Sequence, residues 1–124
     1  MKEKILGACL FIGVIAFVCI NAYILECKIV RTTESVEAIS IHKDNIIDAK
    51  NKAELIFKEF KSQETYLSLS VNHEDLTNIE NSFVDMIGFL SVGDADNAMV
   101  AKSRLINSLE HLRRLSSFRL EAII

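Results

Sequence analysis

The chain has no proline and no tryptophan among its 124 residues, and it has only four glycines and three cysteines. Without proline, no helix is interrupted by the residue that breaks helices most strongly. Three cysteines are too few for a disulfide scaffold, and four glycines exclude a collagen-like or low-complexity chain. Because half of the residues are hydrophobic and Leu, Ile, Ala, Lys and Glu are frequent, the composition predicts a single all-α domain.

The most hydrophobic segment is Ile5–Leu25, which contains no charged residue and one strongly polar residue, Asn21. As a helix, this segment would be about 31 Å long, close to the hydrocarbon thickness of a bilayer. A buried core helix is the alternative, but a chain this short cannot cover such a helix on all sides. We therefore expect a short tail at residues 1–4, a transmembrane helix at residues 5–25 and a helical domain at residues 26–124.

A cleaved signal peptide is the second interpretation of the same segment. Lys2 and Lys4 form a basic start, and Ile20-Asn21-Ala22 is an acceptable cleavage triplet that would release a secreted helical domain. The apolar run nevertheless continues to Leu25, so it is longer than most signal sequences. The sequence therefore favours an uncleaved signal-anchor.

Basic residues flank the span on both sides. Lys2 and Lys4 precede it, and Lys28 and Arg31 follow it. The positive-inside rule, together with the short N-terminal tail, favours a cytoplasmic N-terminus by a small margin. The helical domain would then lie outside the cytoplasm.

Cys27 is the one cysteine outside the span. A Cys27–Cys27 cross-link could join two copies as a homodimer, although a juxtamembrane residue without such a role is the simpler interpretation. Cys9 and Cys19 are expected to act as small apolar residues within the membrane. No Cys-x-x-Cys pair or Cys/His spacing predicts a zinc site.

Apolar spacing and cap residues predict four helices, at about 26–42, 45–70, 73–92 and 95–116. The first continues from the membrane span. Asp44 or Asn45 is expected to cap the second helix, and Asn72 the third. Gly93 suits the left-handed residue that ends a helix, and Asp94 suits the cap of the next. The last helix should end near Ser116, and the apolar tail after it could dock on the bundle.

Two antiparallel helical hairpins would form a small bundle from these helices. Folding the second hairpin about Gly93 places Asp85 near Lys102 and Glu74 near Arg113. The third helix is acidic and the fourth is basic, so complementary charge supports this pairing. A net charge of −3 without a basic stripe argues against nucleic-acid binding.

The same register suggests two weak candidate sites. His73, Glu74 and His111 would meet at the open end of the second hairpin, where two imidazoles and a carboxylate could bind a transition metal or respond to pH. Arg113 and Arg114 could bind an anion. The plainer interpretation is that the acidic groups stabilise the start of a helix and that the histidines are solvated, so we predict no metal site.

No phosphate-binding loop, nucleophile elbow or paired-cysteine motif occurs in the sequence. We therefore expect no enzyme, no catalytic residue and no cofactor. The apolar residues beside the Gly93 turn are candidates for a partner-binding surface: Phe89, Val92, Met99 and Val100.

Several short segments of the second half are distinctive: His73-Glu74-Asp75-Leu76, Asn78-Ile79-Glu80, the Gly93-Asp94 turn, Leu109-Glu110-His111-Leu112 and Glu121-Ala122-Ile123-Ile124. In these segments the sequence resembles domain-of-unknown-function family 4363, short proteins of clostridia and related Firmicutes. It implies a helical domain anchored in the bacterial cytoplasmic membrane by one N-terminal span. It implies no biochemical mechanism.

These observations predict a non-enzymatic, single-pass membrane protein whose helical domain docks on another membrane protein. The alternatives are a small extracytoplasmic sensor for a metal ion or an anion, and a secreted helical domain released by signal-peptide cleavage.

Overall fold

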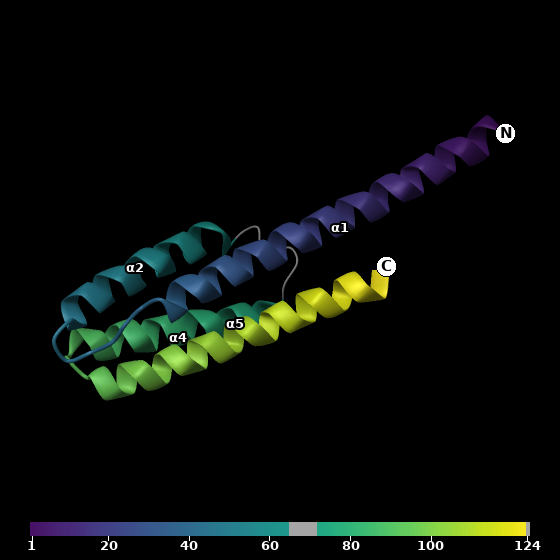
Figure 1. The fold of residues 1–124 in the computed structure, drawn as a ribbon. Coiled ribbons are helices and arrows are strands. Elements are labelled where there is room, and N and C mark those ends of the chain that lie inside the picture. Colours follow the sequence, from purple (N-terminus) through teal and green to yellow (C-terminus); the bar gives the residue numbers. More distant parts are fainter. Residues whose placement is uncertain (65–71, 124) are drawn as a thin grey trace.

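The computed structural model describes residues 1–64 and 72–123, with side chains to residue 115. These residues form four helices and no strand. The helices are α1 (Lys2–Glu37), α2 (Ile46–Ser62), α4 (His73–Ser91) and α5 (Ala95–Ile123) (Figure 1). The predicted all-α bundle with a long apolar first helix is confirmed.

Helix α1 joins the apolar segment to the bundle without a break. All residues from 1 to 18 are exposed, whereas Leu25, Ile29, Thr33 and Val36 on one face of its second half are buried. Among the described residues, α1 is the one helix long and apolar enough to cross a membrane. The first half of α1 projects beyond the bundle, and its second half belongs to the core (Figure 1).

The segment after α1 is a loop rather than a continuation of the helix. The predicted helix to about residue 42 is wrong, because α1 ends at Glu37. Ile39 and Ile41 enter the core from this loop and are 1% and 5% exposed. A helix would not bring both side chains to the same side of the backbone, since residues two apart on a helix diverge. Burial of this pair therefore favours the extended loop.

Asn45 holds this loop instead of capping α2 through its side chain. It occupies the N-cap position, but the cap hydrogen bond is absent. Its Oδ1 accepts a hydrogen bond from the backbone N–H of His42 at 2.7 Å, and its Nδ2 donates to the carbonyl oxygen of Ser40 at 2.9 Å. The predicted cap position is therefore right and its predicted hydrogen bond is wrong.

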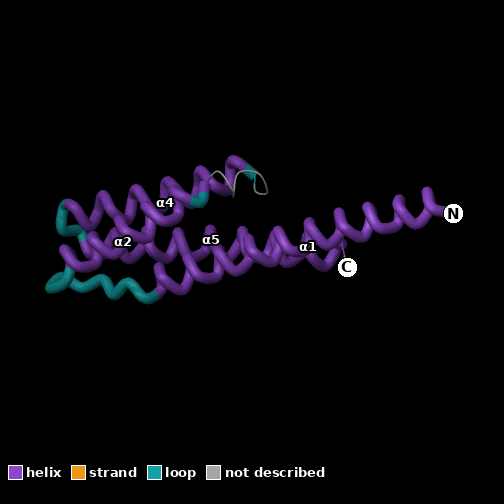
Figure 2. The backbone as a smooth tube through the Cα atoms, turned by 90° about the horizontal axis from the view of Figure 1, so that it is seen from above, coloured by secondary structure: helices purple, strands orange, loops and turns teal. Residues whose placement is uncertain are grey.

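Helix α5 is the centre of the arrangement, because it packs against both α4 and α1 (Figure 2). Helix α2 packs mainly on α4 and contacts α1 only slightly. The α4–α5 pair thus forms the tight hairpin that the sequence predicts, whereas α1 finds its main partner in α5. Small buried residues allow these close approaches: Ala49 and Ala53 in α2, and Ala98 and Ala101 in α5.

Apolar residues at steps of three and four in α4 and α5 form the core. The core residues of both helices are at most 2% exposed: Leu76, Ile79, Phe83, Met86 and Leu90 in α4, and Leu105, Leu109 and Leu112 in α5. Three phenylalanines join α2 to this core. The ring centroid of Phe83 lies 5.1 Å from that of Phe57 and 5.6 Å from that of Phe60.

Two further helix ends, besides that of α1, differ from the prediction. Helix α2 ends at Ser62, and most of the rest of its predicted range lies outside the described residues. Helix α5 continues to Ile123, so the predicted end near Ser116 and the separate docking tail are wrong. No proline or glycine follows Ser116, and Leu120, Glu121 and Ala122 favour a helix. Two serines do not suffice to stop it.

Candidate functional site

The turn between α4 and α5 is built by local hydrogen bonds that its sequence predicts. Gly93 has φ +76°, the left-handed conformation that favours glycine. Its N–H donates to the carbonyl oxygen of Leu90, and the N–H of Asp94 donates to that of Phe89 at 2.9 Å. Asp94 Oδ1 then accepts from the N–H of Asn97 at 3.1 Å, which caps α5.

This turn presents apolar side chains to solvent. Val92 is 78% exposed, Met99 51% and Val100 56%. Phe89, the fourth predicted member of the partner-binding surface, is partly buried against the core. Three of the four candidates therefore lie on the surface, beside a fixed turn.

Ile47 is a further exposed apolar residue, which the sequence analysis missed. It is 77% exposed at the start of α2, and this start lies at the same end of the bundle as the α4–α5 turn (Figure 1). A signal was present, because Ile47 falls outside the stripe of Ile46, Ala49 and Ala53 that faces the core. We call Ile47, Val92, Met99 and Val100 together the distal surface, since they lie at the end far from the apolar half of α1.

The contacts between α4 and α5 place His111 in one groove with Asp75 and correct the predicted partner of Lys102. An open groove of about 220 Å³ between α4 and α5 is lined by Asp75, Asn78, Arg104, Asn107, Ser108 and His111. Asp85 pairs with Arg104, with Nη1 and Oδ2 3.6 Å apart, and not with Lys102. Lys102 instead donates to backbone carbonyl oxygens of Glu37 and Ile39. No ion pair joins Glu74 to Arg113 in the described structure.

The described residues do not assemble the candidate metal site. His73, Glu74 and His111 are all exposed, and His73 is not among the residues that line the groove beside His111. Among the side chains that the structure describes, in residues 1–64 and 72–115, no three of His, Cys, Asp or Glu come together as metal ligands would. Both histidines are exposed, and the described side chains do not bring them together as ligands of one ion.

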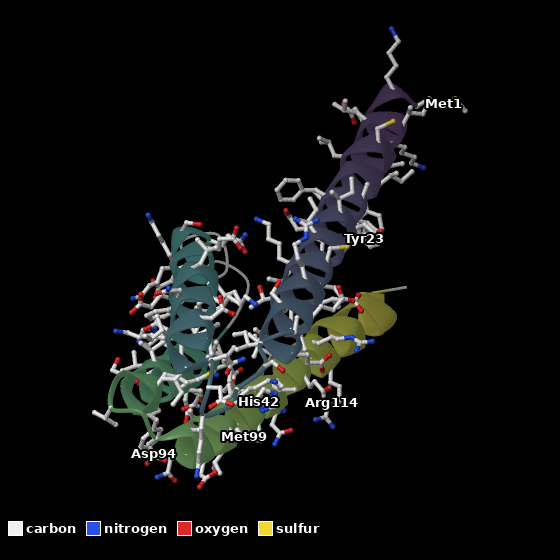
Figure 3. The ribbon with its side chains drawn as sticks, turned by 60° about the vertical axis from the view of Figure 1, so that its left-hand side comes forward. Met1, Tyr23, His42, Asp94, Met99 and Arg114 are labelled. Carbon is white, nitrogen blue, oxygen red and sulfur yellow. The ribbon has the colours of Figure 1, made fainter. Side chains whose placement is uncertain are left out.

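The two candidate anion-binding residues, Arg113 and Arg114, are exposed on α5. Arg114 extends away from α1 on the outer side of α5 (Figure 3). In the described part of the chain, neither arginine forms an ion pair with a carboxylate.

One face of α1 just beyond the apolar segment carries a shallow groove of about 430 Å³, lined by Tyr23, Glu26, Cys27, Val30, Arg31 and Glu34. Cys27 is exposed there and is a free thiol, as are Cys9 and Cys19. Exposure makes Cys27 accessible to a second copy.

Glu64 and Glu80 form a charged cluster with Lys61 that the sequence analysis also missed. The Lys61 Nζ lies 3.6 Å from Glu64 Oε2 and 3.6 Å from Glu80 Oε1. A hydrogen bond between the two carboxyl groups raises the pKa of Glu80 and lowers the pKa of Glu64. Desolvation raises the pKa of Glu80 further. The cluster can hold a proton between the end of α2 and the middle of α4.

Comparison with known proteins places these features in a family without identifying a function. No curated protein and no solved structure matches the chain. The family model described as "Domain of unknown function (DUF4363)" matches residues 19–123. The matched region begins within the apolar segment, in the part of α1 where burial starts, and extends to the end of α5. The chain therefore belongs to the DUF4363 family.

Proposed function

We propose that this chain is a non-enzymatic, single-pass protein of the bacterial cytoplasmic membrane whose helical bundle docks on a partner membrane protein. The observation that carries the proposal is the continuity of α1, which runs unbroken from an exposed apolar half into the bundle core. A helix without a flexible linker fixes the orientation of the bundle relative to its anchor. Such an arrangement suits a protein that presents one surface at a defined height.

The height follows from the length of the helix. From Leu25 to Glu37, α1 rises by about 18 Å at about 1.5 Å per residue. The distal surface lies beyond this end of α1, beside the start of α5, so it would stand roughly 25–30 Å from the membrane, where it can reach the extramembrane part of a neighbouring membrane protein. On this surface, Val92 is 78% exposed and Ile47 is 77% exposed. Exposed apolar side chains of this kind are typical of a surface that a partner covers.

We infer an uncleaved anchor with its N-terminus in the cytoplasm. Cleavage after Ala22 would remove Cys19, Asn21 and Ala22, which are already partly covered by the rest of the protein. Lys2 and Lys4 support a cytoplasmic N-terminus. The mass of the protein isolated from membranes distinguishes the intact chain from the product of cleavage.

Site-specific photo-crosslinking in native membranes tests the docking function. A photoreactive residue at Val92 should give one discrete cross-linked species, and the same residue at Asn81, exposed on α4, should not. The substitution Met99→Asp should abolish the Val92 product, whereas Val84→Asp, at an exposed position of α4, should preserve it. Equal products from Val92 and Asn81 would contradict the proposal.

The sensor function has weaker support. The groove beside His111 offers an imidazole, a guanidinium and a carboxylate, which is a mixed set rather than a dedicated metal or anion site. Calorimetric titration of the purified protein with zinc and with phosphate distinguishes the two functions. Heat that is lost in a His111→Ala variant would favour the sensor.

A further inference from the structure

Helices α1 and α5 run antiparallel, and the position of Lys102 sets their register. Its ammonium group bonds to the carbonyl oxygens of Glu37 and Ile39, so residue 102 lies level with about residue 38. Both helices rise about 1.5 Å per residue, so each step toward the end of α5 is one step back along α1. Leu115 then lies level with about Leu25, and Ile123 with about residue 17.

The exposure of α1 independently indicates the same register. Ile15 and Val18 are 36% and 38% exposed, although Leu10 and Phe17 in the same apolar segment are 64% and 67% exposed. One face of α1 carries apolar residues at steps of three and four: Ile15, Val18, Ala22, Leu25 and Ile29. That face is progressively covered until Leu25 is 4% exposed. The covering begins well before the apolar segment ends.

The end of α5 is the element that lies beside this face. Figures 1 and 2 both show the C-terminal end of α5 next to α1, with the N-terminal part of α1 projecting beyond it. Contact between α1 and α5 is extensive, and the family match includes both Cys19 and Ile123. The last turns of α5 are thus level with residues that a membrane-spanning α1 places inside the bilayer.

We propose that the C-terminal turns of α5, residues 116–123, enter the membrane interface beside α1 and contact lipid. This inference rests on the proposed function, because it requires α1 to span the membrane. These turns alternate apolar and charged residues, with Phe118, Leu120 and Ile123 apolar and Arg119 and Glu121 charged, and charged residues near the end of a membrane helix are tolerated where they reach the headgroups. The protein would then hold the membrane at two points, a span and the end of a second helix.

The residues just before these turns suit the headgroup region. Arg113 and Arg114 are exposed and lie level with about residues 26 and 27 of α1, immediately outside the apolar segment. Guanidinium groups bind phosphate oxygens through paired hydrogen bonds. Lipid phosphates at this level would therefore lie within reach of both arginines, and the helix turns after them are level with residues of the apolar segment.

The absence of tryptophan from the chain allows a direct test. Full-length single-tryptophan variants Phe118→Trp and Leu120→Trp are reconstituted in vesicles of phosphatidylglycerol and phosphatidylcholine brominated on the upper acyl chain. Bromine quenches a tryptophan that reaches the acyl boundary. Positions two apart on a helix sample different sides of it, so the pair keeps the test informative if one substitution impairs folding.

Two further variants serve as references. Phe11→Trp lies in the exposed apolar half of α1, and Val92→Trp lies on the distal surface. We expect Phe118→Trp or Leu120→Trp to be quenched at least about threefold more than Val92→Trp, because only side chains in the interface approach the bromines. If Phe11→Trp is quenched but Phe118→Trp and Leu120→Trp are quenched no more than Val92→Trp, α1 spans the membrane and the inference about α5 is wrong. If Phe11→Trp is not quenched, α1 does not span the membrane, and both the proposed function and this inference are wrong.

Discussion

The ammonium nitrogen of Lys102 lies 2.6 Å from the carbonyl oxygen of Ile39 and 3.3 Å from that of Glu37. The last turn of α1 contains no basic residue of its own. A lysine from α5 therefore supplies the positive charge and the hydrogen-bond donor that the free carbonyl groups at the end of a helix require. This contact also ties the end of α1 to α5, 63 residues later in the chain.

Replacing Lys102 with methionine should destabilise the bundle by about 1–2 kcal/mol, because carbonyl oxygens near the end of α1 lose a charged donor while the aliphatic stem is retained. Chemical denaturation of the full chain in detergent micelles measures this change. Lys58→Met, at an exposed position of α2, is the matched control and should have little effect. An equal loss in both variants would show that Lys102 acts only as a surface charge.

Glycine has opposite consequences at two positions of α4 and its turn. Gly93→Ala should destabilise the protein by about 1–2 kcal/mol, because an L-residue is strained at φ +76°. Gly88→Ala should stabilise it by about 0.5–1 kcal/mol, because Gly88 lies within α4 and alanine favours the helix. At both positions an added Cβ would meet no atom within 4 Å, so steric clash does not contribute.

Thermal unfolding of the two glycine variants, followed by circular dichroism, should therefore give shifts of opposite sign. A fall in melting temperature for both would indicate that the α4–α5 turn does not depend on the left-handed conformation of Gly93.

The hairpin of α4 and α5 could be predicted because its signals are local. Asn72 accepts a hydrogen bond from the N–H of Glu74 at 3.1 Å, and Asp94 caps α5, as their positions before the apolar stripes indicate. Apolar spacing at steps of three and four residues marks the buried faces of α4 and of α5 as far as Leu112, whereas Leu115 continues the same spacing and is 37% exposed. These features need only neighbouring residues, which a single sequence displays.

The contacts that the sequence does not predict join distant segments. Periodicity shows that Ile29 and Val36 are buried, but it does not show that α5 rather than α2 covers them. The sequence predicts that Lys102 pairs with Asp85, because it considers only the α4–α5 hairpin. It does not show that the end of α1 lies beside Lys102. Glu64 and Glu80 meet only because α2 packs on α4. The residues around each glutamate in the sequence therefore do not indicate that the other glutamate lies beside it.

Phe83 is the residue whose truncation should reduce the free energy of unfolding most. It is fully buried, and its ring contacts those of Phe57 and Phe60 across the α2–α4 interface. Phe83→Ala should reduce the free energy of unfolding by about 3–5 kcal/mol, because it leaves a cavity between the two helices. Val84→Ala, at a neighbouring position that is 54% exposed, should change it by less than about 0.5 kcal/mol.

Denaturant titration of the two variants in micelles measures this difference. A loss for Phe83→Ala as small as that for Val84→Ala would mean that α2 does not depend on the phenylalanine contacts for its attachment. A smaller loss for Phe83→Leu than for Phe83→Ala is also expected, since leucine refills part of the space.

The Glu64–Glu80 pair should make stability depend on pH in two directions. The pKa of Glu80 is raised above its ordinary value of 4.5, so the stability that its protonated form contributes is present at low pH and is lost as the pH rises through the raised pKa. The pKa of Glu64 is lowered, so its contribution is present above the ordinary pKa and is lost as the pH falls through the lowered pKa. A shared proton is the physical cause of both shifts.

Glu80→Gln isolates the first effect, because its amide is neutral at every pH and can still donate a hydrogen bond to Glu64. As the pH rises through the raised pKa of Glu80, the wild-type carboxyl group ionises beside Glu64, whereas the amide of the variant does not. We therefore expect the variant to be more stable than the wild type near pH 8, by less than about 1 kcal/mol, with the advantage shrinking near pH 5. Denaturation at both pH values measures the difference, and Glu59→Gln, exposed on α2, is the control that should show no such trend. An advantage of Glu80→Gln that is the same at both pH values would contradict a proton shared between the two carboxyl groups.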